Sequence, residues 1–425
     1  MENVKTYEIS NGVNIRLFKT DKFKTNSISF YLHLPLNRET VTRAALLPRV
    51  LKRGCEKYPT LGEISKRAEE LYGASVALGI SKKGDNQAVK VNIQFVSDSF
   101  LNEKISHEVV DLLKQLVLFP KVTENGFDPG WVSQEKENLK NFIEGLINDK
   151  KEYAQVKCDE IMFEGDPYGI FEYGYVEDLG DIDEKSLYLF YKELLKNAVI
   201  DIWVGGSFEE EKIVSDLKSA FGGLSGRAAE YNKTCLAEIE TEMQIKRITE
   251  PMPTTQSKLV MGFNCGVSPV SSEYYSMMMF SCIFGSSPFS KLFNNVREKL
   301  SLAYYVFSAV DRQKSYMKIS AGIEADKFDA AYNEIMAQLK CMQSGDFSDE
   351  EIFSARKYIS TSLGSAKDSM AAIENFYMGQ IMLGNSESID QLIERVGEVS
   401  REEIIKAANL VQQDTVYFLK GVGSN

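Results

Sequence analysis

The feature that most constrains this chain is a series of signals that occurs twice. Within 425 residues, several segments recur in the same order roughly 217 to 229 residues apart. The first is a capped helix followed by two strands, beginning near Thr60 and again near Ser287. The predicted strands cover 74–81 and 88–96 in the first copy, and 302–310 and 316–323 in the second. One such match has little weight, but the series continues along both halves.

Three further matches follow in register. Asp98 and Asp326 each open a predicted helix, a Phe-polar pair precedes the next helix at 127–128 and at 347–348, and Gly180 corresponds to Gly397. Four ordered matches predict two similar halves that arose by internal duplication. They divide the chain into an N-terminal domain at 1–221, a linker at 222–236 and a C-terminal domain at 237–425. Each half mixes helices with antiparallel hairpins, so the predicted class is α+β, each sheet being mixed, largely antiparallel and covered by helices.

The composition excludes several classes of function. The net charge is −12, and the acidic residues are spread along the sequence. Binding to nucleic acid or to an anionic membrane requires a basic surface, so neither partner is expected. No segment is long and apolar enough to span a bilayer, and the residues after Met1 have no apolar signal region. Together with six scattered cysteines that form no CxxC pair, this predicts a cytoplasmic protein.

Histidine is scarce, which limits the available chemistry. The chain contains only His33 and His107, one in a predicted strand and one in a charged helix. A metal site rich in histidine is therefore excluded. Neither histidine lies in a recognisable nucleophile or ligand pattern, so both are expected to be structural or surface residues.

A run in the second half carries the most specific information. Residues 290–304 read Ser-Lys-Leu-Phe-Asn-Asn-Val-Arg-Glu-Lys-Leu-Ser-Leu-Ala-Tyr. This closely resembles the S-[RK]-L-F-x-x-[IV]-R-E-K-x-x-L-A-Y pattern of the pitrilysin/insulinase metallopeptidases, the inverted zincins that include mitochondrial processing peptidase. The opening hairpin at 7–34 and the Asp-Pro-Tyr-Gly segment at 166–169 also resemble that family. The resemblance implies two homologous domains of about 200 residues arranged as a clam shell.

The same resemblance places a zinc site that this sequence cannot form. Active members carry H-x-x-E-H on a helix of the first half, where histidines four residues apart grip Zn²⁺ and the glutamate activates water. With Gly54 as the anchor, the three positions are Ala45, Pro48 and Arg49. These residues supply neither a ligand nor a base, and Arg49 would repel a divalent cation. No zinc or other cofactor is expected in this chain.

Two details of that region follow from the same comparison. The third zinc ligand of the family is a glutamate further along, and Glu137 is the expected equivalent; the alternative is a solvated helix carboxylate paired with Lys140. Proline inside a helix removes a hydrogen bond and is best tolerated in the first turn. The helix is therefore expected to begin near Pro48.

The second half keeps the residues that the family brings to its substrate. The resemblance implies that Arg297 and Tyr304 bind the peptide, because a guanidinium offers paired donors and a phenol can stabilise an oxyanion. The alternative is that Arg297 pairs with Glu298 and Tyr304 is an ordinary strand residue. Strict alternation places Tyr304 and Val306 on one face of the strand, and Ala303 and Tyr305 on the other.

These observations lead to two hypotheses about function. The first is a catalytically inactive, substrate-binding subunit of a heteromeric, peptide-processing metallopeptidase, whose partner is a zinc-bearing chain of similar size. The second is a structural or peptide-binding scaffold with no role in proteolysis, which forms a homodimer when alone. In both, the ligand is a peptide. No nucleophile–base pair in the sequence supports independent enzyme activity.

Overall fold

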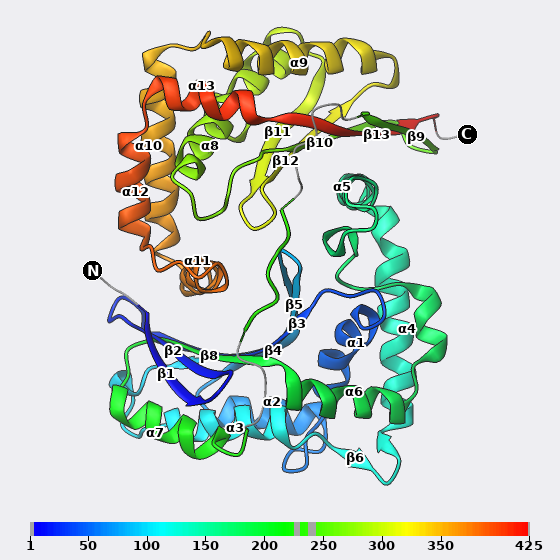
Figure 1. Cartoon of the computed structure of the whole chain (residues 1–425). Coiled ribbons are helices and arrows are strands. Elements are labelled where there is room, and N and C mark those ends of the chain that lie inside the picture. The colour runs from blue at the N-terminus through cyan, green and yellow to red at the C-terminus, as the bar shows by residue number, and fades with distance from the viewer. Residues whose placement is uncertain (1–3, 225–229, 237–243, 424–425) are drawn as a thin grey trace. The chain divides into compact units, whose positions relative to one another are not determined.

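The computed structural model describes residues 4–224, 230–236 and 244–423, which form two compact units (Figure 1). Unit 1 contains residues 1–145, 170–233 and 370–378, and unit 2 contains 146–169, 234–369 and 379–425. The boundaries predicted at 221/222 and 236/237 remain a prediction, since residues 225–229 of the linker and 237–243 lie outside the described residues. The units are not continuous halves of the chain, because residues 146–169 belong to unit 2 and residues 370–378 belong to unit 1.

Unit 1 is built on one mixed sheet. In its described part the strand order is β1-β2-β8-β3-β5-β4, and all neighbours are antiparallel except the parallel pair β2 and β8. The strands are β1 (Lys5–Ser10), β2 (Val13–Lys19), β3 (Thr25–Pro35), β4 (Ser75–Lys83), β5 (Asn86–Val96) and β8 (Val199–Gly206). β4 and β5 confirm the hairpin predicted from the alternation of apolar residues.

Helices cover one face of that sheet and enclose the core of unit 1. Alternate strand residues such as Phe30, Leu32 and Ile202 pack against apolar stripes of the helices. The helices are α1 (Val41–Leu51), α2 (Leu61–Glu70), α3 (Ser106–Leu118), α4 (Pro129–Gly145), α6 (Glu184–Asn197) and α7 (Glu210–Phe221). The predicted cap of α2 is present, since Thr60 accepts a hydrogen bond from the backbone N–H of Glu63.

Unit 2 has a second mixed sheet of the same kind. Its described strands run in the order β11-β12-β10-β13-β9, and only β13 and β9 are parallel. They are β9 (Lys246–Met252), β10 (Ser257–Asn264), β11 (Ala303–Asp311), β12 (Tyr316–Ile323) and β13 (Gln412–Gly421). Read from its other edge, as β9-β13-β10-β12-β11, this sheet has the same order and directions as β2-β8-β3-β5-β4 in unit 1. Two sheets of this type confirm the predicted α+β class.

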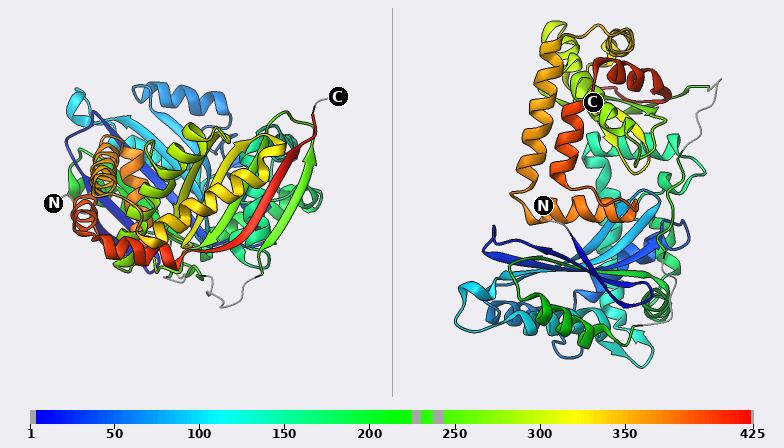
Figure 2. Two further views of the ribbon diagram at one scale, coloured as in Figure 1. Left: turned by 90° about the horizontal axis from the view of Figure 1, so that it is seen from above. Right: turned by 60° about the vertical axis from the view of Figure 1, so that its left-hand side comes forward.

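One face of the second sheet is covered by helices of the chain's second half (Figures 1 and 2). They are α8 (Glu273–Ser281), α9 (Phe328–Ser344), α10 (Asp349–Ala366), α12 (Ile389–Glu398) and α13 (Arg401–Leu410). The predicted capping box of α10 is present, with Ser348 and Glu351 each bonded to the other's backbone N–H. Among the described helices, none has the length and apolar character that a bilayer crossing requires.

The other face of each sheet receives a helix from the opposite half of the sequence. In unit 2 this helix is α5 (Lys150–Met162), whose Ala154 and Cys158 pack against Val260 and Tyr417. In unit 1 it is the first part of α11 (Met370–Met382), whose Tyr377 ring lies 5.3 Å from the Phe18 ring. Each unit is therefore completed by a segment that is distant in sequence.

Two predicted helix starts were wrong. α1 begins at Val41, and Pro48 lies inside it, because the buried side chains of its first turns hold the helix against the core despite the lost hydrogen bond. The helix predicted after Ser287 begins only at Lys291, where a π-helical segment, η6 (Leu292–Lys299), follows. Ser290 caps its first turn by accepting from the N–H of Phe293 at 3.3 Å.

Candidate functional site

The helix α1 carries the three positions at which the family pattern predicts zinc-binding residues. On α1, Ala45 is 2% exposed, Pro48 is buried and Arg49 is partly exposed. Neither Ala45 nor Pro48 offers an atom that binds a metal ion. These three positions do not fit the metal that the family pattern implies.

The Arg49 guanidinium lies beside one end of a row of aromatic rings. Its guanidinium carbon lies 5.3 Å from the centre of the Phe142 ring, which belongs to α4. Phe142 packs against Tyr173 with ring centres 4.5 Å apart, and Tyr173 contacts Phe171 at 5.4 Å. Phe142 remains 45% exposed. A cation thus occupies one of the positions where the active pattern has its ligands, and a half-exposed ring, Phe142, lies next to it.

The acidic residues of α4 divide into an inward and an outward group. Glu135 is buried, accepts a hydrogen bond from Asn138 at 3.1 Å and pairs with Arg53 at 3.2 Å. Glu137, the predicted equivalent of the third ligand, is exposed. Glu135 lies with Val132 and Leu139 on the buried stripe of α4, so their helical spacing was the signal that distinguishes it from Glu137.

The two histidines take structural positions. His33 is buried in β3, with its Nε2 3.1 Å from Asp201, and His107 is an exposed residue of α3 that lies 3.2 Å from Asp216. Within residues 4–224, 230–236 and 244–423, no three His, Cys, Asp or Glu side chains gather in a way that could hold a metal ion.

In unit 2, Arg297 lies near the end of η6. Its side chain is 43% exposed, its Nε is 3.3 Å from Glu298, and its guanidinium carbon is 4.9 Å from the centre of the Phe293 ring. The Leu300 N–H donates to the carbonyl of Asn295, five residues back, at 3.1 Å. Such wide turns are rare and occur often at functional sites. Arg297 is therefore a surface cation presented by an unusual helix.

Tyr304 lies on a β-bulge at the start of β11. Ala303 pairs with Ile323 and Tyr305 with Gly322, so Tyr304 is an extra residue in the ladder. It is 57% exposed and donates a hydrogen bond to Glu324 at 3.2 Å. The bulge overturns the predicted alternation, because Ala303 now shares the core face with Val306.

A buried ionic network on the face of the unit 1 sheet that receives α11 was not predicted. Arg16 Nε donates to Asp201 at 2.7 Å, and the Tyr231 hydroxyl donates to the same carboxylate at 2.6 Å. Burial opposes ionisation of Asp201, but the contact with His33, the charge of Arg16 and the Tyr231 hydroxyl outweigh it and lower its pKa to about 2. The partners come from β2, β3, β8 and the segment after α7, so no local pattern reveals them.

A second network joins α11 to the same sheet face. Buried Glu374 accepts a hydrogen bond from the Tyr31 hydroxyl and lies 2.8 Å from Lys90 Nζ. Burial and the neighbouring Glu374 carboxylate raise the pKa of Tyr31 far above its ordinary value, so its hydroxyl stays protonated as a donor. These contacts fix the first part of α11 to unit 1.

Comparison with known proteins gives consistent results. The family described as "Peptidase M16 inactive domain" matches residues 181–358. A Bacillus subtilis protein named "Probable inactive metalloprotease YmfF" is 30% identical over 417 residues, which is 96% of each chain. A second protein of that bacterium, "Uncharacterized zinc protease YmxG", is 22% identical over 247 residues, covering 56% of this chain and 58% of that one.

Solved structures extend the comparison to the fold. A conserved protein from Enterococcus faecalis is similar with a TM-score of 0.92 and 29% identity, over 100% of both chains. A peptidase M16 inactive domain from Pseudomonas fluorescens gives a TM-score of 0.80 at 16% identity, also over 100% of both chains. At that identity the second likeness concerns the fold alone.

Proposed function

This chain belongs to the M16 peptidase family as an inactive homologue, and from that premise we propose that it is the peptide-binding, non-catalytic subunit of a heteromeric peptidase. Its partner is a zinc-bearing M16 chain of similar size. The observation that carries the proposal is the contrast between its two motif regions. The ligand positions hold Ala45, Pro48 and Arg49, while Arg297 and Tyr304 remain exposed in the other motif.

The relatives support a division of labour between two chains. One Bacillus subtilis relative is named as an inactive metalloprotease, and another relative of the same bacterium is named as a zinc protease. One genome thus contains both kinds of chain. A subunit that lacks zinc ligands is useful to a peptidase only if it contributes binding groups or completes the assembly.

The chemistry of the exposed groups supports a peptide as ligand. Arg297 offers paired donors to a carbonyl or carboxylate, and the Tyr304 hydroxyl can donate to an oxyanion. In unit 1, β4 is an edge strand paired only with β5 among the described strands, and α1 packs beside it. An extended peptide could add to that edge by main-chain hydrogen bonds.

The test is reconstitution with a zinc-bearing M16 chain from the same genome. Native mass spectrometry of the co-expressed chains should give a complex of the two with about one zinc, and the complex should cleave a fluorogenic peptide library. We expect Arg297→Ala to lower kcat/KM by about tenfold or more without loss of assembly. Arg395→Ala is the matched control, since Arg395 is exposed and pairs only loosely with Glu398 at 3.7 Å.

A scaffold role is the second candidate, favoured by the ordered fold of a chain without catalytic residues. In that case the protein assembles without a zinc-bearing partner, and Arg297→Ala changes neither assembly nor any proteolysis. A metal-free homo-oligomer recovered from the native host would therefore replace the first proposal with this one.

A further inference from the structure

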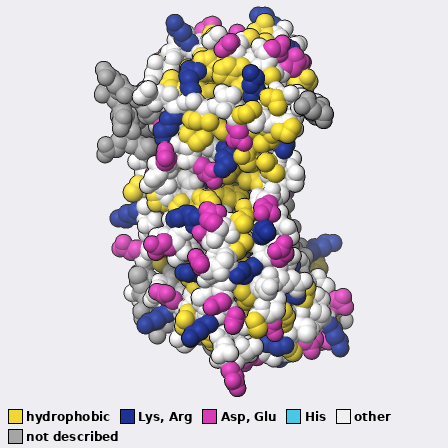
Figure 3. All heavy atoms as spheres, turned by 90° about the vertical axis from the view of Figure 1, so that its right-hand side faces the viewer, with side chains coloured by type: hydrophobic (Ala, Val, Ile, Leu, Met, Phe, Trp, Pro, Cys, Tyr) yellow, Lys and Arg dark blue, Asp and Glu magenta, His cyan; other side chains and the backbone are white. Residues whose placement is uncertain are grey.

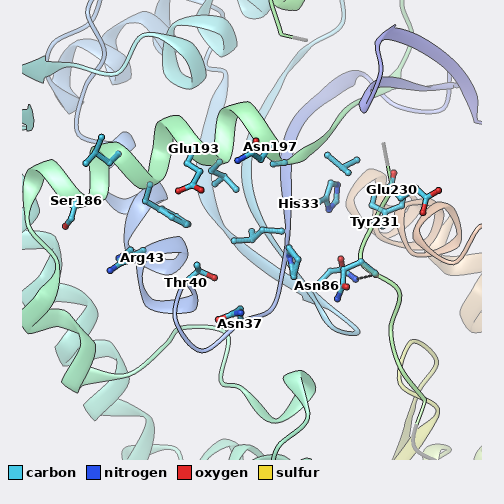
Figure 4. A pocket seen from close by; sticks show the side chains of 18 residues that line it. His33, Asn37, Thr40, Arg43, Asn86, Ser186, Glu193, Asn197, Glu230 and Tyr231 are labelled. Carbon is cyan, nitrogen blue, oxygen red and sulfur yellow. Dashed lines mark hydrogen bonds between the residues drawn. The ribbon is translucent and has the colours of Figure 1, made fainter. Parts of the chain in front are cut away.

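Unit 1 contains a cavity that the proposed function does not use (Figure 4). Its volume is about 720 Å³, within the roughly 300–1,000 Å³ typical of small-molecule sites. The end of β3, the start of α1, the β4–β5 turn, the exposed side of α6 and residues 230–232 form its wall. All of these segments belong to the same compact unit.

Hydrogen bonds hold the wall at residues 230–232 in place. Asn86 donates to the carbonyl of Asn232 at 2.8 Å, and the Asn232 amide donates to the carbonyl of Asp85 at 3.1 Å. The hydroxyl of the neighbouring Tyr231 donates a hydrogen bond to the buried carboxylate of Asp201 on β8. His33 is 5% exposed and also lines the cavity, and its Nδ1 has no hydrogen-bond partner among the described residues. The cavity therefore has an ordered wall and contains one buried side chain, His33, with a ring nitrogen unpaired within the described residues.

Unpaired polar groups lie on two sides of the cavity. Thr40 and Arg43 come from the start of α1, and Glu193 and Asn197 come from one side of α6 (Figure 4). Within the described part of the chain, none of these four side chains has a hydrogen bond or an ion pair. The remaining wall combines apolar residues, among them Leu189, Phe190 and Leu194, with polar ones such as Ser186 and Glu230.

We propose that this cavity binds a small zwitterion with an apolar body, of the class of an α-amino acid or dipeptide with an aliphatic side chain. Arg43 and Thr40 would receive its carboxylate, Glu193 and Asn197 its ammonium group, and Leu189 and Phe190 its side chain. Among the described residues that line the cavity, Arg43 is the only lysine or arginine, which disfavours phosphorylated ligands. This proposal does not depend on the partner subunit.

Isothermal titration calorimetry of the full-length protein with leucine and leucyl-leucine tests the site. N-acetyl-leucinamide, which has neither the ammonium nor the carboxylate charge, is the blocked analogue. At least one zwitterion should bind saturably, and the blocked analogue at least tenfold more weakly. Arg43→Gln and Glu193→Gln should each weaken binding of the zwitterion at least tenfold. The controls are Lys196→Gln and Glu211→Gln, which change the same charges at exposed positions outside the cavity.

Circular dichroism melting curves of the variants separate lost binding from lost folding. Both cavity residues are at least partly exposed, so their variants should melt like the wild-type protein. The proposal is overturned if no zwitterion binds saturably, if the blocked analogue binds as well as the zwitterions, or if folded cavity variants bind like the controls.

Discussion

At the scale of single residues, the positions where the family pattern predicts zinc ligands are part of the protein's packing. Ala45 and Pro48 are buried on α1, and the Arg49 guanidinium lies over the Phe142 ring. A buried alanine leaves no space for an imidazole without movement of its neighbours. In this chain, packed side chains therefore occupy the positions where the family pattern has its ligands.

This packing predicts that introducing the H-x-x-E-H motif does not create a zinc site. The triple substitution Ala45→His, Pro48→Glu and Arg49→His should bind less than about 0.1 zinc per chain after desalting, because Phe142 and the Arg53–Glu135 pair occupy the side of α4 that contacts α1. Overpacking at position 45 should cost about 1–3 kcal/mol. Elemental analysis and urea unfolding measure the two effects. About one bound zinc per chain would contradict the prediction.

The Asp201 network predicts a defined dependence of stability on pH. Its pKa is about 2 when folded, below the ordinary 3.8, so its stabilisation is complete above about pH 4 and is lost as the pH falls through 2. The contribution is on the order of 2 kcal/mol. Asp201→Asn should lower the free energy of unfolding at pH 7 and weaken its fall between pH 4 and pH 2. Urea titrations at several pH values check this, with Asp181→Asn as the exposed control.

At the scale of helices and strands, local signals predicted two helix starts that have side-chain caps. Thr60 and Ser348 each accept a hydrogen bond from the N–H of a Glu three residues later, and at Ser348 the Glu351 side chain also accepts from the Ser348 N–H. The helix starts predicted at Pro48 and Ser287 were wrong for two other reasons. In α1, tertiary packing overrides the cost of an interior proline, and a π-helical turn has no distinctive sequence pattern.

The cap of α10 gives a direct test at this scale. Ser348→Ala removes the acceptor for the N–H of Glu351 and should destabilise the protein by about 1 kcal/mol. Ser362→Ala on the exposed side of the same helix should be neutral or slightly stabilising, since alanine has the higher helix propensity. Thermal denaturation of both variants measures the difference. Equal melting temperatures would show that the cap contributes nothing.

Some features of the candidate site could be predicted from the sequence, and others could not. The positions of the family's ligand pattern and Arg297 were predicted from short runs, because a motif keeps its residues adjacent in sequence. The bulge at Tyr304 depends on how β11 pairs with β12, and the Asp201 network joins residues from four segments. Contacts of that kind are set by the whole sheet and leave no periodic trace in the sequence.

At the scale of the whole molecule, the charge is dispersed and the compact units interleave along the chain. Acidic and basic side chains are interspersed over the face drawn in Figure 3, without a continuous basic patch on that face. Each unit borrows a helix from the other half of the sequence: α5 covers the β10 and β13 side of unit 2, and α11 packs against Phe18 in unit 1.

The interleaving predicts the behaviour of separated halves. A fragment of residues 1–233 lacks the part of α11 that covers Trp203 and Phe18, and a fragment of 234–425 lacks α5. Each alone should aggregate or melt without cooperativity, whereas co-expressed fragments should associate and recover a cooperative transition. Size-exclusion chromatography with near-ultraviolet circular dichroism distinguishes these outcomes. Two stable, monomeric fragments would refute the prediction.

The first part of α11, which completes unit 1, also determines when unit 1 can finish folding during synthesis. Unit 1 stays incomplete on the ribosome until residues 370–378 have been synthesised, long after its own sheet has emerged. At elongation rates of about 5–20 residues per second, that delay is on the order of ten seconds. Throughout it, the face with Trp203 and Phe18 is uncovered. The first half of this protein should therefore be a client of ribosome-associated chaperones, even though the finished molecule buries both rings.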